Sequence, residues 1–137
     1  YQTGDFEKAK AELDYANPTA QALLLKGLLS YRERNYQDAV ARFRQAVIEE
    51  GMKPGPAILL NLAAALLQTR TYTEAEDLLN QAQELFSQSI EVLNNRGVLY
   101  LKTGRYEEAE SVLEESLTRR ADQPEVRRLL EQIRTLT

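Results

Sequence analysis

Residues 94–117 read NNRGVLYLKTGRYEEAESVLEESL and place small and aromatic side chains at fixed offsets in a helix-forming stretch. Gly97, Gly104 and Ala109 are small, and Tyr106 precedes Ala109 by three positions. The same spacing returns elsewhere in the chain, most clearly in KGLLSYRERNYQDAVARFRQAV at 26–47 and LAAALLQTRTYTEAEDLLNQAQ at 62–83. Self-similarity at this period predicts a repeated helical unit, each copy stacked on the next.

Each copy carries an alanine that marks the start of its second helix. These marker alanines are Ala9, Ala39, Ala75 and Ala109, which lie 30, 36 and 34 residues apart, and the aromatic residues three positions before them are Phe6, Tyr36, Tyr72 and Tyr106. Gly27, Ala63 and Gly97 stand midway along the first helices. Small side chains at these points allow two helices to cross closely.

The turn between the two helices of a copy is also marked. Gly104 suits a left-handed residue after a helix C-terminus. Arg34 and Arg70 hold the same place in the other copies, so we expect a strained or differently shaped turn there. Helix starts are predicted at Thr71, which forms a capping-box pattern with Glu74, and at Asp122, which does so with Glu125.

The pattern resembles the tetratricopeptide repeat, a helix–turn–helix unit of about 34 residues. The resemblance implies an all-α fold, a right-handed superhelical solenoid of antiparallel helix pairs, in a single domain 1–137. Its expected parts are a half repeat at 1–16, full repeats at about 20–53, 56–89 and 90–123, and a capping helix at 124–136. The arginines of the last helix form either the polar face of a cap or a docking surface for an acidic partner.

The resemblance also implies a concave groove lined by the first helices, in which a peptide is bound. The peptide-binding residues it implies here are Leu24, Leu28, Tyr31, Leu60, Asn61, Ala64, Leu67, Asn94, Asn95, Val98, Leu101 and Lys102. Most of these are apolar, and each asparagine amide can hydrogen-bond a peptide backbone from both sides. We therefore expect an apolar or amphipathic ligand segment, bound as a helix in the groove.

One subclass of the family holds C-terminal carboxylates with a clamp of lysine, asparagine and arginine. Of the clamp positions, only Asn61 is retained here. Leu24 and Leu28 replace a lysine and an asparagine, and Glu91 and Asn95 replace the final lysine and arginine. The resemblance therefore does not extend to carboxylate-tail binding.

Two functions are compatible with this pattern. The first is a non-catalytic adaptor or scaffold that binds a protein or peptide partner in the groove. The alternative is a structural assembly component whose groove and ends pack against identical chains or a fixed complex, by analogy with bacterial pilus, secretion or envelope machinery. A separate interpretation of the groove leucines is that they are covered within the protein, by an upstream helix or by another copy of the chain.

Composition excludes several kinds of chemistry. The chain has no cysteine and no histidine, which removes thiol nucleophiles, imidazole bases and Cys/His metal sites. The net charge is −4 without a basic stripe, which argues against nucleic acid as the partner. We expect no enzyme activity, no cofactor and no membrane span. The acidic pairs Glu49/Glu50, Glu107/Glu108 and Glu114/Glu115 are interpreted as a solvated face. The sequence is compatible with a location in either the cytoplasm or the periplasm.

Overall fold

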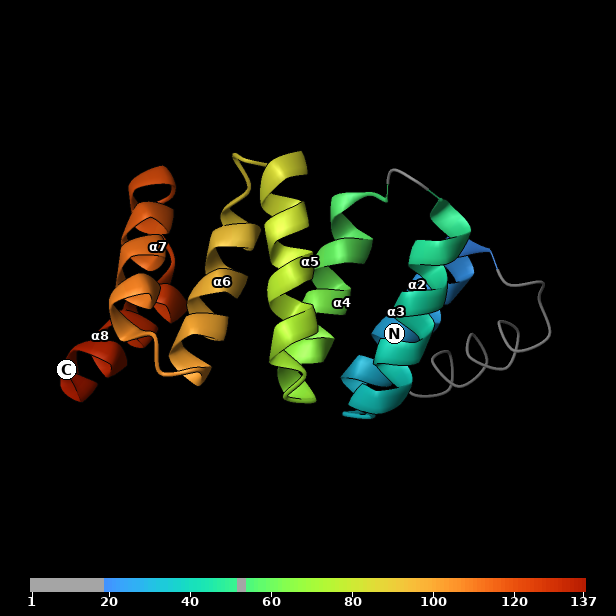
Figure 1. Cartoon of the computed structure of the whole chain (residues 1–137), viewed down its shortest axis with the longest axis horizontal. Helices are drawn as coiled ribbons and strands as arrows, with labels where there is room; N and C mark the ends of the chain where they lie inside the picture. Colours follow the sequence, from blue (N-terminus) through green and yellow to red (C-terminus); the bar gives the residue numbers. More distant parts are fainter. Residues whose placement is uncertain (1–18, 52–53) are drawn as a thin grey trace. The chain divides into compact units, whose positions relative to one another are not determined.

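The computed structural model describes residues 19–51 and 54–137, and every regular element among them is an α-helix. The helices are α2 (Ala20–Arg32), α3 (Tyr36–Glu50), α4 (Pro56–Gln68), α5 (Tyr72–Leu85), α6 (Ile90–Lys102), α7 (Tyr106–Arg119) and α8 (Pro124–Leu136) (Figure 1). The predicted all-α class is confirmed. The predicted half repeat at 1–16 lies outside the described residues.

The chain forms two compact units, Tyr1–Thr69 and Arg70–Thr137. In the first unit, α3 packs against both α2 and α4. In the second unit, α6 packs against α5 and α7, and α8 packs against α7. Successive helices within each unit are joined by short turns, which makes them antiparallel neighbours.

The corner between α2 and α3 closes by two backbone hydrogen bonds. The amide of Asn35 donates to the carbonyl of Ser30 at 2.8 Å, and the amide of Arg34 donates to the carbonyl of Tyr31 at 3.0 Å. This is the Schellman arrangement, which satisfies the last carbonyls of a helix. Asn35 then caps α3, because its side chain accepts from the amide of Asp38 at 3.3 Å.

The residue at the centre of this turn adopts a left-handed conformation. Gly104 has φ of 78°, and Arg34 and Arg70 both have φ of 62°. A side chain in this region is disfavoured because its Cβ lies close to the backbone oxygen. The strained turns predicted at the two arginines are therefore confirmed.

Two close helix crossings form the centre of the packing. A Cβ built on Gly27 would overlap the ring of Phe43, and one built on Gly97 would overlap the side chain of Leu113. Both glycines are buried, and Phe43 and Leu113 are fully buried as well. The glycines are thus required by close approach and not by backbone conformation.

The other small marker residues are buried in the same way. Ala39, Ala46, Ala63, Ala75, Ala82, Ala109 and Ser116 all have 0% exposure. Their burial confirms that the repeated positions are contact points between helices. Ala9 and Phe6 carry the same pattern but lie outside the described residues.

The predicted helix starts are correct in part. Thr71 is the N-cap of α5, but its side chain makes no capping hydrogen bond. The N-cap of α8 is Gln123 and not Asp122, because Pro124 takes the first helical position. Proline is favoured there, since its missing N–H would have no intrahelical acceptor.

None of the helices in the described parts of the chain combines the length and the apolar character that crossing a bilayer requires. The longest of them, α3, has 15 residues.

We predict that Gly27→Ala destabilises the chain by about 1–3 kcal/mol, because the added methyl group overlaps the Phe43 ring. Urea denaturation followed by circular dichroism measures this. The double variant Gly27→Ala/Phe43→Leu should cost less than the sum of the two single changes, since the smaller side chain makes room. Strict additivity of the two would contradict the close crossing.

Candidate functional site

The predicted binding residues of the first unit lie on α2 and α4, and these two helices are in contact. Leu24 and Tyr31 on α2 and Leu60 on α4 are half-buried, and Leu28 is 40% exposed. We use the name α2–α4 surface for the predicted binding residues that are at least partly exposed, namely Leu24, Leu28, Tyr31, Leu60, Asn61 and Ala64. It is apolar apart from Asn61 and the Tyr31 hydroxyl.

Tyr31 connects this surface to its surroundings. Its ring meets the ring of Tyr36 edge to face, with centroids 5.0 Å apart and an interplanar angle of 71°. Its hydroxyl accepts a hydrogen bond from Gln68 Nε2 at 3.5 Å. Tyr31 is therefore held in place by groups from both α3 and α4, and it offers a fixed aromatic face.

Leu67 differs from the other predicted binding residues of α4. It is 3% exposed and forms part of the buried core. Ala64 and Asn61, which precede it on α4, are half-buried.

The second unit holds the predicted binding residues of α6. Asn95, Val98 and Leu101 are half-buried, and Lys102 is exposed. Asn94 is engaged within the protein. Its Nδ2 donates to Gln123 Oε1 at 2.9 Å, and its Oδ1 accepts from Ser116 Oγ at 2.5 Å.

Asn94, Ser116 and Gln123 together form a polar triad between α6, α7 and the start of α8. Gln123 is 6% exposed, and its Nε2 lies 3.0 Å from Ser116 Oγ and 2.8 Å from the Arg120 carbonyl oxygen. Gln123 was absent from the sequence prediction. The available signal was Ser116, which stands where the other copies have Ala46 and Ala82 and so needs a polar partner when buried.

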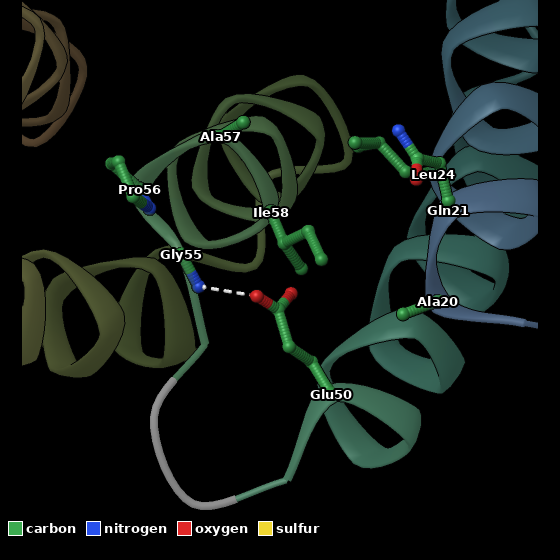
Figure 2. Close-up of a pocket in the computed structure, with 8 residues that line it drawn as sticks. All are labelled: Ala20, Gln21, Leu24, Glu50, Gly55, Pro56, Ala57 and Ile58. Carbon is green, nitrogen blue, oxygen red and sulfur yellow. Dashed lines mark hydrogen bonds between the residues drawn. The ribbon is translucent and has the colours of Figure 1, made fainter.

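The first unit has a cavity with mainly apolar walls at the position that corresponds to the polar triad. Leu24 and Asn94 are each the fifth residue of their helix, and Gly55 and Gln123 each directly precede the next first helix. A cavity of about 410 Å³ opens beside Leu24 and is lined by Ala20, Gln21, Leu24, Glu50, Gly55, Pro56, Ala57 and Ile58 (Figure 2). In the second unit the cavity beside Asn94 is about 320 Å³ and has charged walls, among them Arg120, Asp122, Glu125 and Arg128.

The acidic pairs lie on exposed helix surfaces. Glu115 pairs with Arg119 at 3.0 Å, and Glu114 pairs with Arg134 at 3.1 Å. No group of three or more acidic side chains able to hold a metal ion occurs among the residues described by the structure.

Glu108 belongs to the best-connected charge cluster of the second unit. Arg105 Nη2 lies 2.9 Å from Glu108 Oε2, and Arg105 Nη1 lies 2.8 Å from Glu76 Oε2. The hydrogen bond from Arg105 lowers the pKa of Glu108 below its usual value. The hydrogen bonds to Glu108 and Glu76 raise the pKa of Arg105. A general acid needs a raised carboxyl pKa, so this cluster ties helices together and is unsuited to proton transfer.

Family models of the tetratricopeptide repeat match residues 1–49 and 56–122 of the chain. Among proteins with curated descriptions, none matches the sequence at a significant level.

Several solved structures have a similar fold. The Arabidopsis OM64 TPR domain aligns with a TM-score of 0.77 at 20% identity, covering 85% of this chain and 94% of that one. The APC/C hetero-tetramer Cut9–Hcn1 aligns with a TM-score of 0.83 at 21% identity, covering 96% of this chain and 27% of that one. The first TPR of Spaghetti (RPAP3), bound to the HSP90 peptide SRMEEVD, aligns with a TM-score of 0.77 at 20% identity, covering 89% of this chain and 96% of that one.

We predict that Ser116→Ala destabilises the chain by about 1–3 kcal/mol, because the half-buried amide of Asn94 and the buried amide of Gln123 lose the hydroxyl that both of them bond. Chemical denaturation measures the change. Ser111→Ala on the exposed side of α7 is the matched control and should stay within about 0.5 kcal/mol of the parent chain. Equal effects of both changes would contradict the triad.

We also predict an acid-sensitive contribution from Glu108. Its pKa is lower in the folded than in the unfolded chain, so its stabilisation is present above the unfolded pKa and is lost as pH falls through the folded one. Glu108→Gln should lower the melting temperature at pH 7, and the difference from the parent should shrink towards pH 3. Glu107→Gln, on the neighbouring exposed residue, is the matched control and should lower the melting temperature at pH 7 less than Glu108→Gln does.

Proposed function

Because the chain belongs to the tetratricopeptide repeat family, we propose that it is a non-catalytic interaction module that binds an apolar or amphipathic peptide segment. The proposed binding site in the first unit is the α2–α4 surface. The observation that carries the proposal is Leu28, a large aliphatic side chain that is 40% exposed on a surface otherwise made of half-buried apolar residues. When a partner covers such a side chain, apolar surface is removed from water, which favours binding.

The peptide backbone would be bound by amide groups at this surface. Asn61 lies among the leucines of α4, and its side chain offers both a donor and an acceptor. We therefore assign the polar contact of the first unit to Asn61, and anchoring to Leu24, Leu28 and Leu60.

The preferred ligand differs from that of the structural neighbour with the bound peptide. That TPR domain was solved with the peptide SRMEEVD, which is rich in acidic residues. This chain has Leu24, Leu28 and Glu91 at three positions where the carboxylate clamp has lysine or asparagine. An acidic tail would meet apolar side chains and a like charge, so we propose a ligand with aliphatic anchors.

A second candidate is a structural component that assembles with copies of itself. The observation that favours it is the exposure of large aliphatic residues away from the α2–α4 surface, with Ile48 75% and Leu136 52% exposed. Light scattering over a range of concentrations separates the two. A monomer at all concentrations favours the interaction module, and a discrete oligomer favours the assembly component.

We predict that Leu28→Glu weakens peptide binding and leaves the fold intact. The probe is a set of peptides selected from a random 16-residue display library on the parent chain, with affinity measured by fluorescence anisotropy. Placing a carboxylate among apolar side chains should weaken binding by about tenfold or more. The melting temperature should change little, since Leu28 is exposed.

Ile48→Glu is the matched control, because it introduces the same charge at an exposed aliphatic residue of α3. It should leave peptide affinity unchanged. The proposal fails if no peptide is selected on the parent chain, or if the two variants bind equally well. A collapsed melting transition for Leu28→Glu would instead assign Leu28 to the core.

A further inference from the structure

The cavity of the first unit lies where three helix ends meet. Residues at the start of α2, the end of α3 and the start of α4 line it. Figure 2 shows Ile58 beside the Glu50 carboxylate, with Leu24 facing them from α2. Leu24 also belongs to the α2–α4 surface, so the cavity continues that surface towards the start of α4.

Gly55 leaves the edge of this cavity without a side chain. At the equivalent position of the second unit, the side chain of Gln123 bonds to Asn94 and Ser116 and lines a cavity of about 320 Å³. In the first unit the three equivalent residues are Gly55, Leu24 and Ala46, none of which carries a polar side chain. The two cavities therefore differ in the chemistry of their walls, which are mainly apolar beside Leu24 and polar and charged beside Asn94.

Gly55 does not need to be glycine for its own conformation. Its φ of −70° and ψ of 164° are accessible to any residue. A Cβ built there would come within 3.3 Å of Glu50 Oε1, the movable end of a side chain. A larger residue would fit at this point at the expense of the cavity.

The wall opposite Leu24 carries a negative charge. Glu50 is exposed, and its Oε1 accepts a hydrogen bond from the Gly55 amide at 3.0 Å. A carboxylate has further acceptor capacity beyond one hydrogen bond. Glu49 and Glu50 both lie in the last turn of α3, which contains no basic residue. Acidic groups at a helix C-terminus add to the negative end of the helix dipole, so the cavity mouth attracts a cation.

We propose that this cavity receives one aliphatic side chain of the bound peptide, and that a lysine or arginine beside that side chain pairs with Glu50. The proposal rests on the proposed function and names the ligand chemistry for one part of it. The aliphatic group packs against Leu24 and Ile58, and the cation lies at the C-terminal end of α3.

The first test fills the cavity. Gly55→Gln places in the first unit the side chain found at the equivalent position of the second, and it takes up part of the cavity volume. Peptides selected on the parent chain should bind Gly55→Gln about tenfold or more weakly. Ala41→Gln, an exposed position on α3, is the matched control and should keep the parent affinity. Both variants should keep the parent melting temperature within about 3 °C.

The second test reverses the charge and does not depend on the first. Glu50→Lys should weaken binding by up to about fivefold, the range of an exposed ion pair. Replacing the basic residue of the peptide by glutamate should restore that loss. Glu49→Lys alters the net charge equally but lies outside the cavity lining, so it should change affinity less and show no rescue.

The outcomes separate this inference from the proposed function. One outcome is that the peptides bind the parent chain, bind Leu28→Glu more weakly, and bind Gly55→Gln and Glu50→Lys as tightly as the parent. This result would overturn the proposed role of the cavity but would agree with the proposed interaction module. Failure to select any peptide would overturn both. If Gly55→Gln lowers the melting temperature or the oligomer size, the chain itself or a second copy occupies the cavity, which also overturns the proposal.

Discussion

The close approach of two helices at a glycine is the constraint on which the rest of this structure depends. Gly27 faces the ring of Phe43 and Gly97 faces Leu113, with no room for a methyl group at either crossing. The distance between paired helices is fixed by a missing side chain. Once that distance is set, the marker alanines are buried and the Schellman corner can close with the amide of Asn35 on Ser30.

The constraint is strong enough to hold an unfavourable backbone. Arg34 and Arg70 keep the left-handed conformation that Gly104 adopts without cost in the third repeat. Each arginine costs about 1–2 kcal/mol in this conformation. At Arg34 the two corner hydrogen bonds and the packing of α2 against α3 offset that cost. Strain here reflects the geometry of the repeat and indicates no reactive site.

The repeats share one helix–turn–helix backbone, so differences in function between them depend on the side chains that vary from repeat to repeat. The same point in the repeat is an apolar cavity beside Leu24 and a polar triad around Asn94. The triad satisfies its own hydrogen bonds, so it stabilises the protein and has little capacity left for a ligand. Among residues 19–51 and 54–137, none forms a comparable set of hydrogen bonds across the cavity beside Leu24. A binding role therefore fits the first unit better at this position.

The sequence by itself determined the all-α repeat, the buried marker residues and the left-handed arginines. These features are local and periodic, so the spacing seen in one repeat predicts the same feature in the others. Only the tertiary structure decided that Asn94 is bound by Ser116 and Gln123, which lie 22 and 29 residues away. It also decided that Leu67 is buried and that a cavity opens at Gly55. The sequence pattern alone does not predict these features, because they depend on how side chains from three separate helix ends pack together.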